Sequence, residues 1–497
     1  MSPVYRGDMR LALLFFVVGL ARGAVLQGVV LDEDTGNPLA RTSVTLTPLA
    51  GTDARSLTIR TGDRGSFSML SVRAGWYVLK TSRKGYADAE AGQLRPGRPG
   101  IPFEVLPETQ SSFFQLRMKR LAAVTGSLLD ENNMGLPDLP VHVYTARKPI
   151  RRVAEGKTDD RGVFRVGGLE PGRYLVRSGS GQLEDGSGVI PTWYKYGVSV
   201  ETAEAFRLQL GETQQDAVIR PQPGRLFTIS GILSPPPQRP EGPVRLTIIT
   251  DTGRRLAASA AGPFEIANVP PGPLELVAEG FECGNYSKLV ADRDLSGLRI
   301  GCNPLYRPMV DWLVTDRARA NITYPLLVRR VDLDGASAAG IFRTNELILP
   351  GHYELMVQTS PKHYAQTIRM NFGGQPVTKQ DGWFGLDFGN QVRLAVTLSD
   401  TPASIAGRVT ASGKPVAGAV VYLELFNAKA VETRLQLWTT RSDHTGKYQF
   451  AGLTPGAYRL ISTFDFDPED RFALKDAKVA KVSDGETGVV ELELQLR

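Results

Sequence analysis

One block of sequence recurs five times along the chain and constrains its fold more than any other feature. Its clearest copies read GKYQFAGLTPGAYRLIS at 446–462 and GVFRVGGLEPGRYLVRS at 162–178, and the others begin at residues 65, 262 and 340. Before the turn, apolar and polar residues alternate in every block except the one that begins at residue 340. The turn itself is Pro-Gly, or Ala-Gly in the first copy. Alternation at period two is typical of half-buried strands, and Pro-Gly reverses a chain without strain. Each block therefore predicts a strand, a sharp turn and a second strand.

A large residue stands three positions after the Pro of each turn, and four of the five are tyrosines. A tyrosine at such a corner can bury its ring while its hydroxyl reaches a backbone carbonyl. We therefore expect these residues to belong to the core, with a row of ligand-binding aromatics as the alternative. The five corner residues are Tyr77, Tyr174, Leu274, Tyr353 and Tyr458.

A second signature precedes four of the blocks and consists of an apolar residue, a small or polar residue and a glycine that open a further strand. The fourth block lacks this partner, and Phe342 precedes Pro350 by eight rather than seven residues, which predicts a bulge or a longer turn. Together the signatures predict an all-β fold, a tandem array of about five small β-sandwich domains. We place these domains at 24–119, 120–222, 223–303, 304–400 and 401–497, and the glycines are Gly28, Gly126, Gly231 and Gly407.

These motifs resemble the carboxypeptidase regulatory-like domain, most strongly at 24–90, 121–180 and 403–463. That domain is a transthyretin-like sandwich related to carbohydrate-binding-like and CnaB-like folds. The chain resembles bacterial exported proteins that carry this domain in tandem copies. The resemblance implies immunoglobulin-like or transthyretin-like sandwiches. It also implies no catalytic role, because the domain is non-catalytic in carboxypeptidases. It does not identify a ligand, since one fold supports many functions.

The N-terminus has the features of an export signal. Arg6 and Arg10 precede the apolar run LALLFFVVGL at 11–20, and Ala21 and Gly23 are the small residues that a signal peptidase reads. We predict a signal peptide over 1–23 and a secreted, periplasmic or cell-surface protein. A run of ten apolar residues is shorter than the roughly 20 that cross a bilayer. The mature chain is therefore expected to have no transmembrane span.

The chain has two cysteines, and we expect Cys283 and Cys302 to form a disulfide after export, with two free buried thiols as the alternative. A zinc site is not expected, because the four histidines lie far apart in sequence. Motifs of zinc proteases, serine hydrolases and nucleotide-binding loops are missing, so we predict no catalytic residue, no metal and no cofactor. The acidic turns at 32–34 and at Asp332 and Asp334 leave calcium open as an alternative.

The segment IPTWYKYG is the strongest candidate for a ligand site, through Trp193, Tyr194 and Tyr196. Exposed aromatic rings beside Lys195 can stack on a sugar or grip a peptide. The alternative is that the cluster packs across the junction between the second and third domains and fixes their angle.

The sequence thus favours a non-catalytic exported protein that binds or scaffolds an envelope or extracellular protein through loops and strand edges. A carbohydrate-binding protein that stacks a glycan on Trp193 and Tyr194 is the alternative. A third possibility is an accessory subunit of a peptidase or outer-membrane machine. The net charge of +6 on 497 residues is too small an excess to indicate a nucleic-acid partner.

Overall fold

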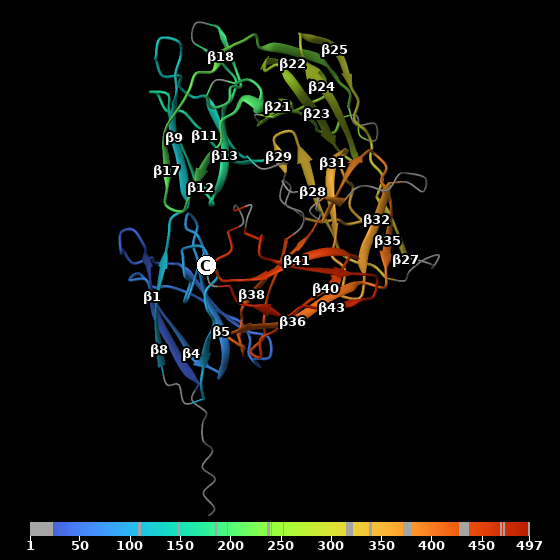
Figure 1. Ribbon diagram of the computed structural model, residues 1–497. Coiled ribbons are helices and arrows are strands. Elements are labelled where there is room, and N and C mark those ends of the chain that lie inside the picture. The colour runs from blue at the N-terminus through green and yellow to red at the C-terminus, as the bar shows by residue number, and fades with distance from the viewer. Residues whose placement is uncertain are drawn as a thin grey trace, which may run out of the picture.

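The computed structural model describes most of the chain after the predicted signal segment, of which residues 1–22 lie outside the described part (Figure 1). The described residues are 23–495 without 108–110, 147–149, 184–185, 196, 236–238, 240, 252, 315–321, 337–339, 371–378, 381, 427–436, 468–469 and 471–472.

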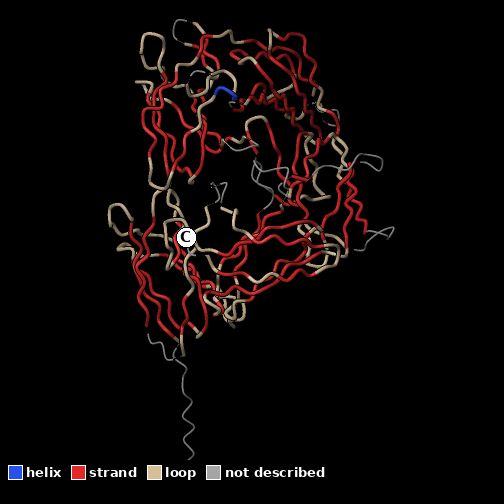
Figure 2. The backbone as a smooth tube through the Cα atoms, viewed as in Figure 1, coloured by secondary structure: helices blue, strands red, loops and turns tan. Residues whose placement is uncertain are grey.

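The described chain is all-β, as predicted, and a 3-10 turn at Val200–Thr202 is its one helical element (Figure 2). No described helix is long and apolar enough to cross a bilayer. The described strands form several small sheets, which pack in five groups around separate buried apolar cores. We call these groups units 1 to 5.

The bounds of the strands follow the repeats. Unit 1 has β1 Ala24–Asp32, β2 Ser43–Pro48, β3 Leu57–Arg60, β4 Ser66–Val72, β5 Gly75–Ser82, β6 Ala89–Glu90, β7 Phe103–Val105 and β8 Ser111–Met118. Unit 2 has β9 Ala122–Leu128, β10 Pro140–Thr145, β11 Arg152–Lys157, β12 Val163–Leu169, β13 Gly172–Ser178, β14 Gly181–Gln182, β15 Gly188–Ile190, β16 Phe206–Leu208, β17 Thr213–Ile219 and β18 Gln222–Pro223. Unit 3 has β19 Phe227–Leu233, β20 Val244–Thr250, β21 Gly253–Ala258, β22 Gly262–Val269, β23 Gly272–Gly280, β24 Cys283–Ala291, β25 Leu295–Ile300 and β26 Asn303–Pro304.

The last two units complete the array. Unit 4 has β27 Met309–Val314, β28 Leu326–Asp332, β29 Gly335–Ala336, β30 Gly340–Ile341, β31 Gly351–Val357, β32 Tyr364–Met370, β33 Lys379–Gln380, β34 Trp383–Phe388 and β35 Arg393–Ser399. Unit 5 has β36 Ala403–Ala411, β37 Lys414–Pro415, β38 Val420–Leu425, β39 Leu437–Arg441, β40 Lys447–Leu453, β41 Gly456–Ser462, β42 Lys478–Val482, β43 Thr487–Val489 and β44 Leu492–Glu493.

In units 1 to 4 the first strand lies parallel to the last strand longer than two residues, as in the pairs β1–β8 and β9–β17. In unit 5 the first strand lies parallel to the short strands β43 and β44. This pairing explains the recurrent glycine of the first strand, because a carbonyl oxygen of the neighbouring last strand lies against its Cα. A Cβ on Gly28 would lie 2.2 Å from the Phe114 oxygen, and one on Gly407 would lie 1.8 Å from the Val490 oxygen. Gly126 and Gly231 have equivalent neighbours at 2.1 and 2.2 Å. Only glycine fits at these positions.

The corner tyrosines are buried, and each hydroxyl donates to the carbonyl oxygen four residues earlier. The O···O distances are 3.0 Å for Tyr77, 2.7 Å for Tyr174, 2.9 Å for Tyr353 and 2.6 Å for Tyr458. Leu274, at the same corner position of unit 3, is buried in its core but has no hydroxyl to form this hydrogen bond. Each bond satisfies a carbonyl at the turn between the two strands of the block.

Unit 4 departs from the repeat by more than the predicted bulge or longer turn. Its block begins with the two-residue strand β30, and no strand follows between there and the corner at Pro350. In the other units the strand before the corner pairs with the first strand, but in unit 4 that strand is missing and β32 pairs with β35 instead. The first strand β27 is therefore left at the edge of its sheet.

Candidate functional site

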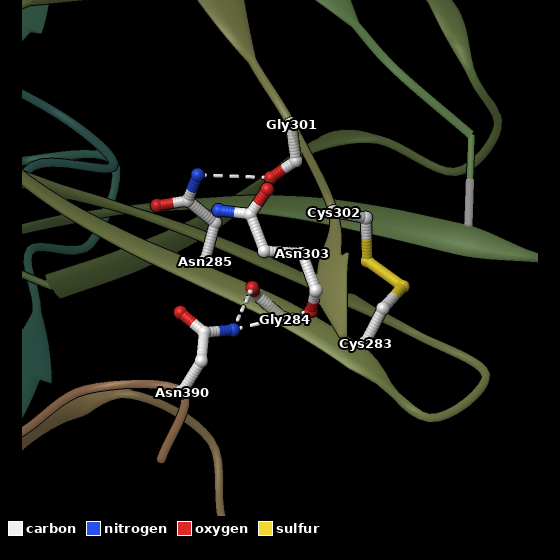
Figure 3. Close-up of a disulfide and its surroundings, with 7 residues drawn as sticks. All are labelled: Cys283, Gly284, Asn285, Gly301, Cys302, Asn303 and Asn390. Carbon is white, nitrogen blue, oxygen red and sulfur yellow. Dashed lines mark hydrogen bonds between the residues drawn. A yellow bond between two sulfur atoms is a disulfide. The ribbon is translucent and has the colours of Figure 1, made fainter. Parts of the chain in front are cut away.

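The two cysteines form the predicted disulfide at the end of unit 3 (Figure 3). Cys283 begins β24 and Cys302 follows β25, with 5.3 Å between their Cα atoms, and both are buried. Closing a loop of 19 residues in this way contributes about 3 kcal/mol through the unfolded state.

The backbone beside the disulfide is where unit 4 attaches to unit 3 (Figure 3). The Asn390 amide nitrogen donates to the carbonyl oxygens of Gly284 at 2.9 Å and Asn303 at 3.1 Å. The Tyr306 N–H donates to the Asn390 carbonyl oxygen at 3.0 Å. The disulfide therefore holds together the two segments that Asn390 bridges.

Trp193 is buried at the junction of units 2 and 3, with 5% of its surface exposed. Its ring centroid lies 5.0 Å from that of Tyr144, and the Arg177 guanidinium lies 5.0 Å above the indole. Arg177 also forms an ion pair with Asp251 of unit 3, and the Tyr144 hydroxyl donates to the Asp251 carbonyl oxygen at 3.0 Å. This burial favours the junction-packing interpretation over a surface on which a sugar stacks.

The other two residues of the aromatic candidate site do not join Trp193 in one surface. Tyr194 is half-buried and packs edge-on against Phe206 at 6.2 Å between centroids, within the core of unit 2. The Lys195 ammonium lies 5.8 Å from the Tyr194 ring. Tyr196 lies outside the described residues.

A network of charged residues joins units 2, 3 and 4. Arg254 of unit 3 reaches Asp334 of unit 4 at 2.9 Å and Asp332 at 3.3 Å, and Arg152 of unit 2 reaches Asp334 at 3.4 Å. A cavity of about 330 Å³ lies there, and its lining includes Arg152, Glu155, Arg254 and Asp334. Because opposite charges meet in pairs around this cavity, the arrangement suits a joint between domains better than a site for one charged ligand.

The acidic turns that left calcium open are engaged by other donors. The Asp32 carboxylate accepts from Tyr86 at 2.7 Å, from Arg120 at 3.0 Å and from the Thr35 backbone N–H at 2.9 Å. Burial alone would raise the pKa of Asp32, but these hydrogen bonds hold it well below its ordinary value. Asp332 and Asp334 face arginines as described above. No described group of three or more acidic, histidine or cysteine side chains has the geometry of a metal site.

Strand β8 of unit 1 presents a regular free edge. It pairs with β1 over eight consecutive residues without a register shift, and no described strand pairs with its other side. Phe113 on this strand is 70% exposed, between the exposed Ser111 and Gln115. Figure 1 shows β8 at the outer margin of unit 1. The sequence predicted binding through strand edges but did not identify β8, because the register in which strands pair cannot be read from the sequence.

The comparisons with known proteins match the ends of the described chain to one family. The carboxypeptidase regulatory-like domain matches residues 25–100 and 404–495, and the family match includes no catalytic domain. No curated protein matches the chain.

The solved structures to which the chain is similar include bacterial pilins, at low sequence identity. The shaft pilin SpaA from Lactobacillus rhamnosus GG is 14% identical, with 41% of this chain and 99% of that chain covered and a TM-score of 0.25. The TIE protein of Bacillus anthracis is 12% identical, with 92% and 69% covered and a TM-score of 0.16. The sequence match therefore shows carboxypeptidase regulatory-like domains at two places in this β-sandwich chain, in units 1 and 5.

Proposed function

We propose that this protein is a non-catalytic extracytoplasmic scaffold that binds an extended segment of a protein partner along strand β8 of unit 1. The observation that carries the proposal is the free edge of β8. An unpaired row of backbone N–H and C=O groups is a template for another strand, and many peptide-binding domains use it in this way.

The equivalent edges of the other units are less suited to strand addition. In units 2 and 3 the parallel pairing of the last strand is interrupted by a register shift, near Asp216 and near Gly297. In unit 5 the last strand is split into β43 and β44. In unit 4 the edge strand β27 is regular, but only its first side chain is exposed. Bulges and breaks of this kind protect an edge from pairing, and β8 has neither.

The exposed side chains of β8 define the partner that fits. Phe113 stands between two polar neighbours on the face that points to solvent. An added strand that places an apolar or aromatic residue opposite Phe113 gains about 0.2–1 kcal/mol from that cross-strand pair, in addition to its backbone hydrogen bonds. The partner segment is therefore extended, with alternating apolar and polar residues.

An extracytoplasmic location fits the disulfide, because disulfides persist in oxidising compartments and are rare in the cytosol. It also follows from the predicted signal peptide at 1–23. The joints between units support a scaffold, since units held in fixed positions present β8 in one orientation.

A displayed library of random peptides tests this function with the whole protein. Peptides selected on the wild-type chain should lose binding to Phe113→Lys, because an edge lysine opposes strand addition. The matched control is Val489→Lys, which changes an equally exposed apolar residue on the split edge of unit 5 and should leave binding intact. In addition, bound peptide should slow amide hydrogen exchange in 111–118. Peptides that bind both variants equally, or that protect other strands, would refute the proposal.

A further inference from the structure

Units 1 and 5 dock against each other although their strands lie at opposite ends of the described chain (Figure 1). Arg441 at the end of β39 places its guanidinium 2.6 Å from the Glu90 carboxylate and donates to the Gly100 carbonyl oxygen at 3.1 Å. The Gly100 N–H in turn donates to Glu90 at 2.7 Å. The side chains of Arg441 and Glu90 are only 22% and 18% exposed. This pair is therefore largely shielded from screening by salt.

A second set of ion pairs lies beside the first. Arg98 of unit 1 lies 3.5 Å from Asp465 and 3.6 Å from Asp467 of unit 5. Arg95 also reaches Asp465, at 3.2 Å, and Arg207 of unit 2 reaches Asp467 at 2.9 Å. Two carboxylates of unit 5 thus meet three arginines of units 1 and 2, and the charges are complementary.

The backbones of the two units also fit closely. A Cβ on Gly418 of unit 5 would lie 2.3 Å from Cγ of Pro102 and 2.9 Å from Cδ1 of Leu49 in unit 1. A Cβ on Gly51 would lie 2.6 Å from Nδ1 of His444. We call the two surfaces the latch faces: Glu90, Arg95, Arg98, Gly100 and Pro102 on unit 1, and Gly418, Arg441, Asp465 and Asp467 on unit 5.

No short linker joins the latch faces, whereas consecutive units are joined by short segments such as 400–402 between β35 and β36. Because units 1 and 5 have separate cores, a rotation about 400–402 would separate the latch faces without opening either sandwich. The boundary between units 4 and 5 carries a side-chain hydrogen bond from Tyr364 to Asp484 at 3.1 Å, which such a rotation breaks.

We propose that the latch faces form an interaction surface for a second copy of this chain. The five described units follow one another around a closed ring, in which unit 1 meets unit 5 of its own chain (Figure 1). When unit 5 rotates away, the latch face of unit 1 can bind the latch face of unit 5 in a second copy. Unit 1 of the second copy then binds unit 5 of the first, so the two chains exchange the same contacts. The tether raises the effective concentration of the chain's own face, which favours the closed monomer in dilute solution. This contact is separate from β8 and goes beyond the proposed function.

An exchange of charges between two full-length variants tests the proposal. Glu90→Arg places two arginines at the latch, and Arg441→Glu places two carboxylates there, so each variant alone should open its ring. When the two variants are mixed, each new residue faces an opposite charge on the other chain. Analytical ultracentrifugation should show an extended monomer for each variant alone and the mass of two chains for the mixture.

The controls separate the latch from general effects of charge. Both substitutions in one chain should restore the compact monomer. Glu104→Arg mixed with Lys447→Glu, both at exposed positions of units 1 and 5, should remain a mixture of compact monomers. If Glu90→Arg or Arg441→Glu unfolds its unit, Arg98→Glu and Asp467→Lys repeat the exchange at the second set of ion pairs. A mixture of folded variants that stays monomeric, or single variants that stay compact, would overturn the proposal.

Discussion

At the scale of single residues, the chemistry that recurs in the repeats is local and could be predicted from the sequence. The corner tyrosines and the turns follow from alternation and Pro-Gly, which depend only on neighbouring residues. The role of the first-strand glycine could not be predicted, because the oxygen that excludes a Cβ at Gly407 belongs to Val490, at the far end of the unit.

The glycine account predicts a large effect of one methyl group. Gly407→Ala should destabilise unit 5 by about 1–3 kcal/mol, because its Cβ would overlap the Val490 oxygen and push β43 away from β36. Hydrogen exchange in 403–411 and 487–493 should speed up. Gly389→Ala is the control, since a Cβ there meets no atom within 4 Å and should change neither segment. Unchanged exchange in Gly407→Ala would contradict the account.

Tyr144 gives the junction of units 2 and 3 a dependence on alkaline pH. Burial raises the pKa of Tyr144 from 10.0 to about 12. Below pH 10 the Tyr144 hydroxyl is protonated in both the folded and the unfolded state, so its full contribution to the free energy of unfolding is present. Between pH 10 and 12 the unfolded state loses this proton first, and the stability falls by up to about 3 kcal/mol as pH rises. Thermal unfolding of the wild type and Tyr144→Phe across this range measures the effect, and parallel pH profiles of the two would disprove it.

At the scale of strands, the sequence predicted the two strands of each block. It did not predict which strands of a unit pair with each other. The disulfide followed from cysteine count and compartment, and the structure confirms it. The loss of the strand before the corner in unit 4 was underestimated as a bulge, because Phe342 remains buried and keeps the apolar pattern although its backbone is not in a strand. Burial at a single position does not determine backbone pairing.

The disulfide should stabilise unit 3 and its joint to unit 4 together. Cys283→Ala combined with Cys302→Ala should destabilise unit 3 by roughly 2–4 kcal/mol through loss of loop closure. Exchange in 283–291 should speed up, and so should exchange near Asn390, because its carbonyl partners lie on the two linked segments. Unit 5 is the internal control and should keep its rates. Faster hydrogen exchange in unit 3 with unchanged rates near Asn390 would show that the joint does not depend on the disulfide.

At the scale of the whole molecule, the described units follow one another around a ring (Figure 1). The ion pairs between units could not be predicted from the sequence. Glu90 and Arg441 are 351 residues apart, and neither differs in kind from the many exposed charges of the chain. The aromatic cluster shows the same limit. Trp193 stood out in the sequence, but Asp251, which holds its neighbours Tyr144 and Arg177, lies in another unit, so the contacts that fix the junction could not be identified from the sequence.

The joint of units 2, 3 and 4 should depend on Arg254. Arg254→Met removes one arginine from each of two buried carboxylates, which keep Arg330 on Asp332 and Arg152 on Asp334. The loss of charged hydrogen bonds should therefore destabilise the joint by about 1.5–3 kcal/mol. Exchange in 326–336 should therefore speed up. Arg245→Met, which removes an exposed ion pair with Glu279 in the same unit, is the matched control and should have little effect. Equal effects of both variants would show that the joint does not rest on this network.

Small-angle X-ray scattering from the wild-type chain in dilute solution tests the closed ring most directly. The account predicts a scattering curve that fits the ring with unit 1 docked on unit 5, and a longer maximum dimension for Glu90→Arg, whose latch pair is broken. A wild-type curve that fits an extended row of five separate sandwiches, unchanged by this substitution, would contradict it.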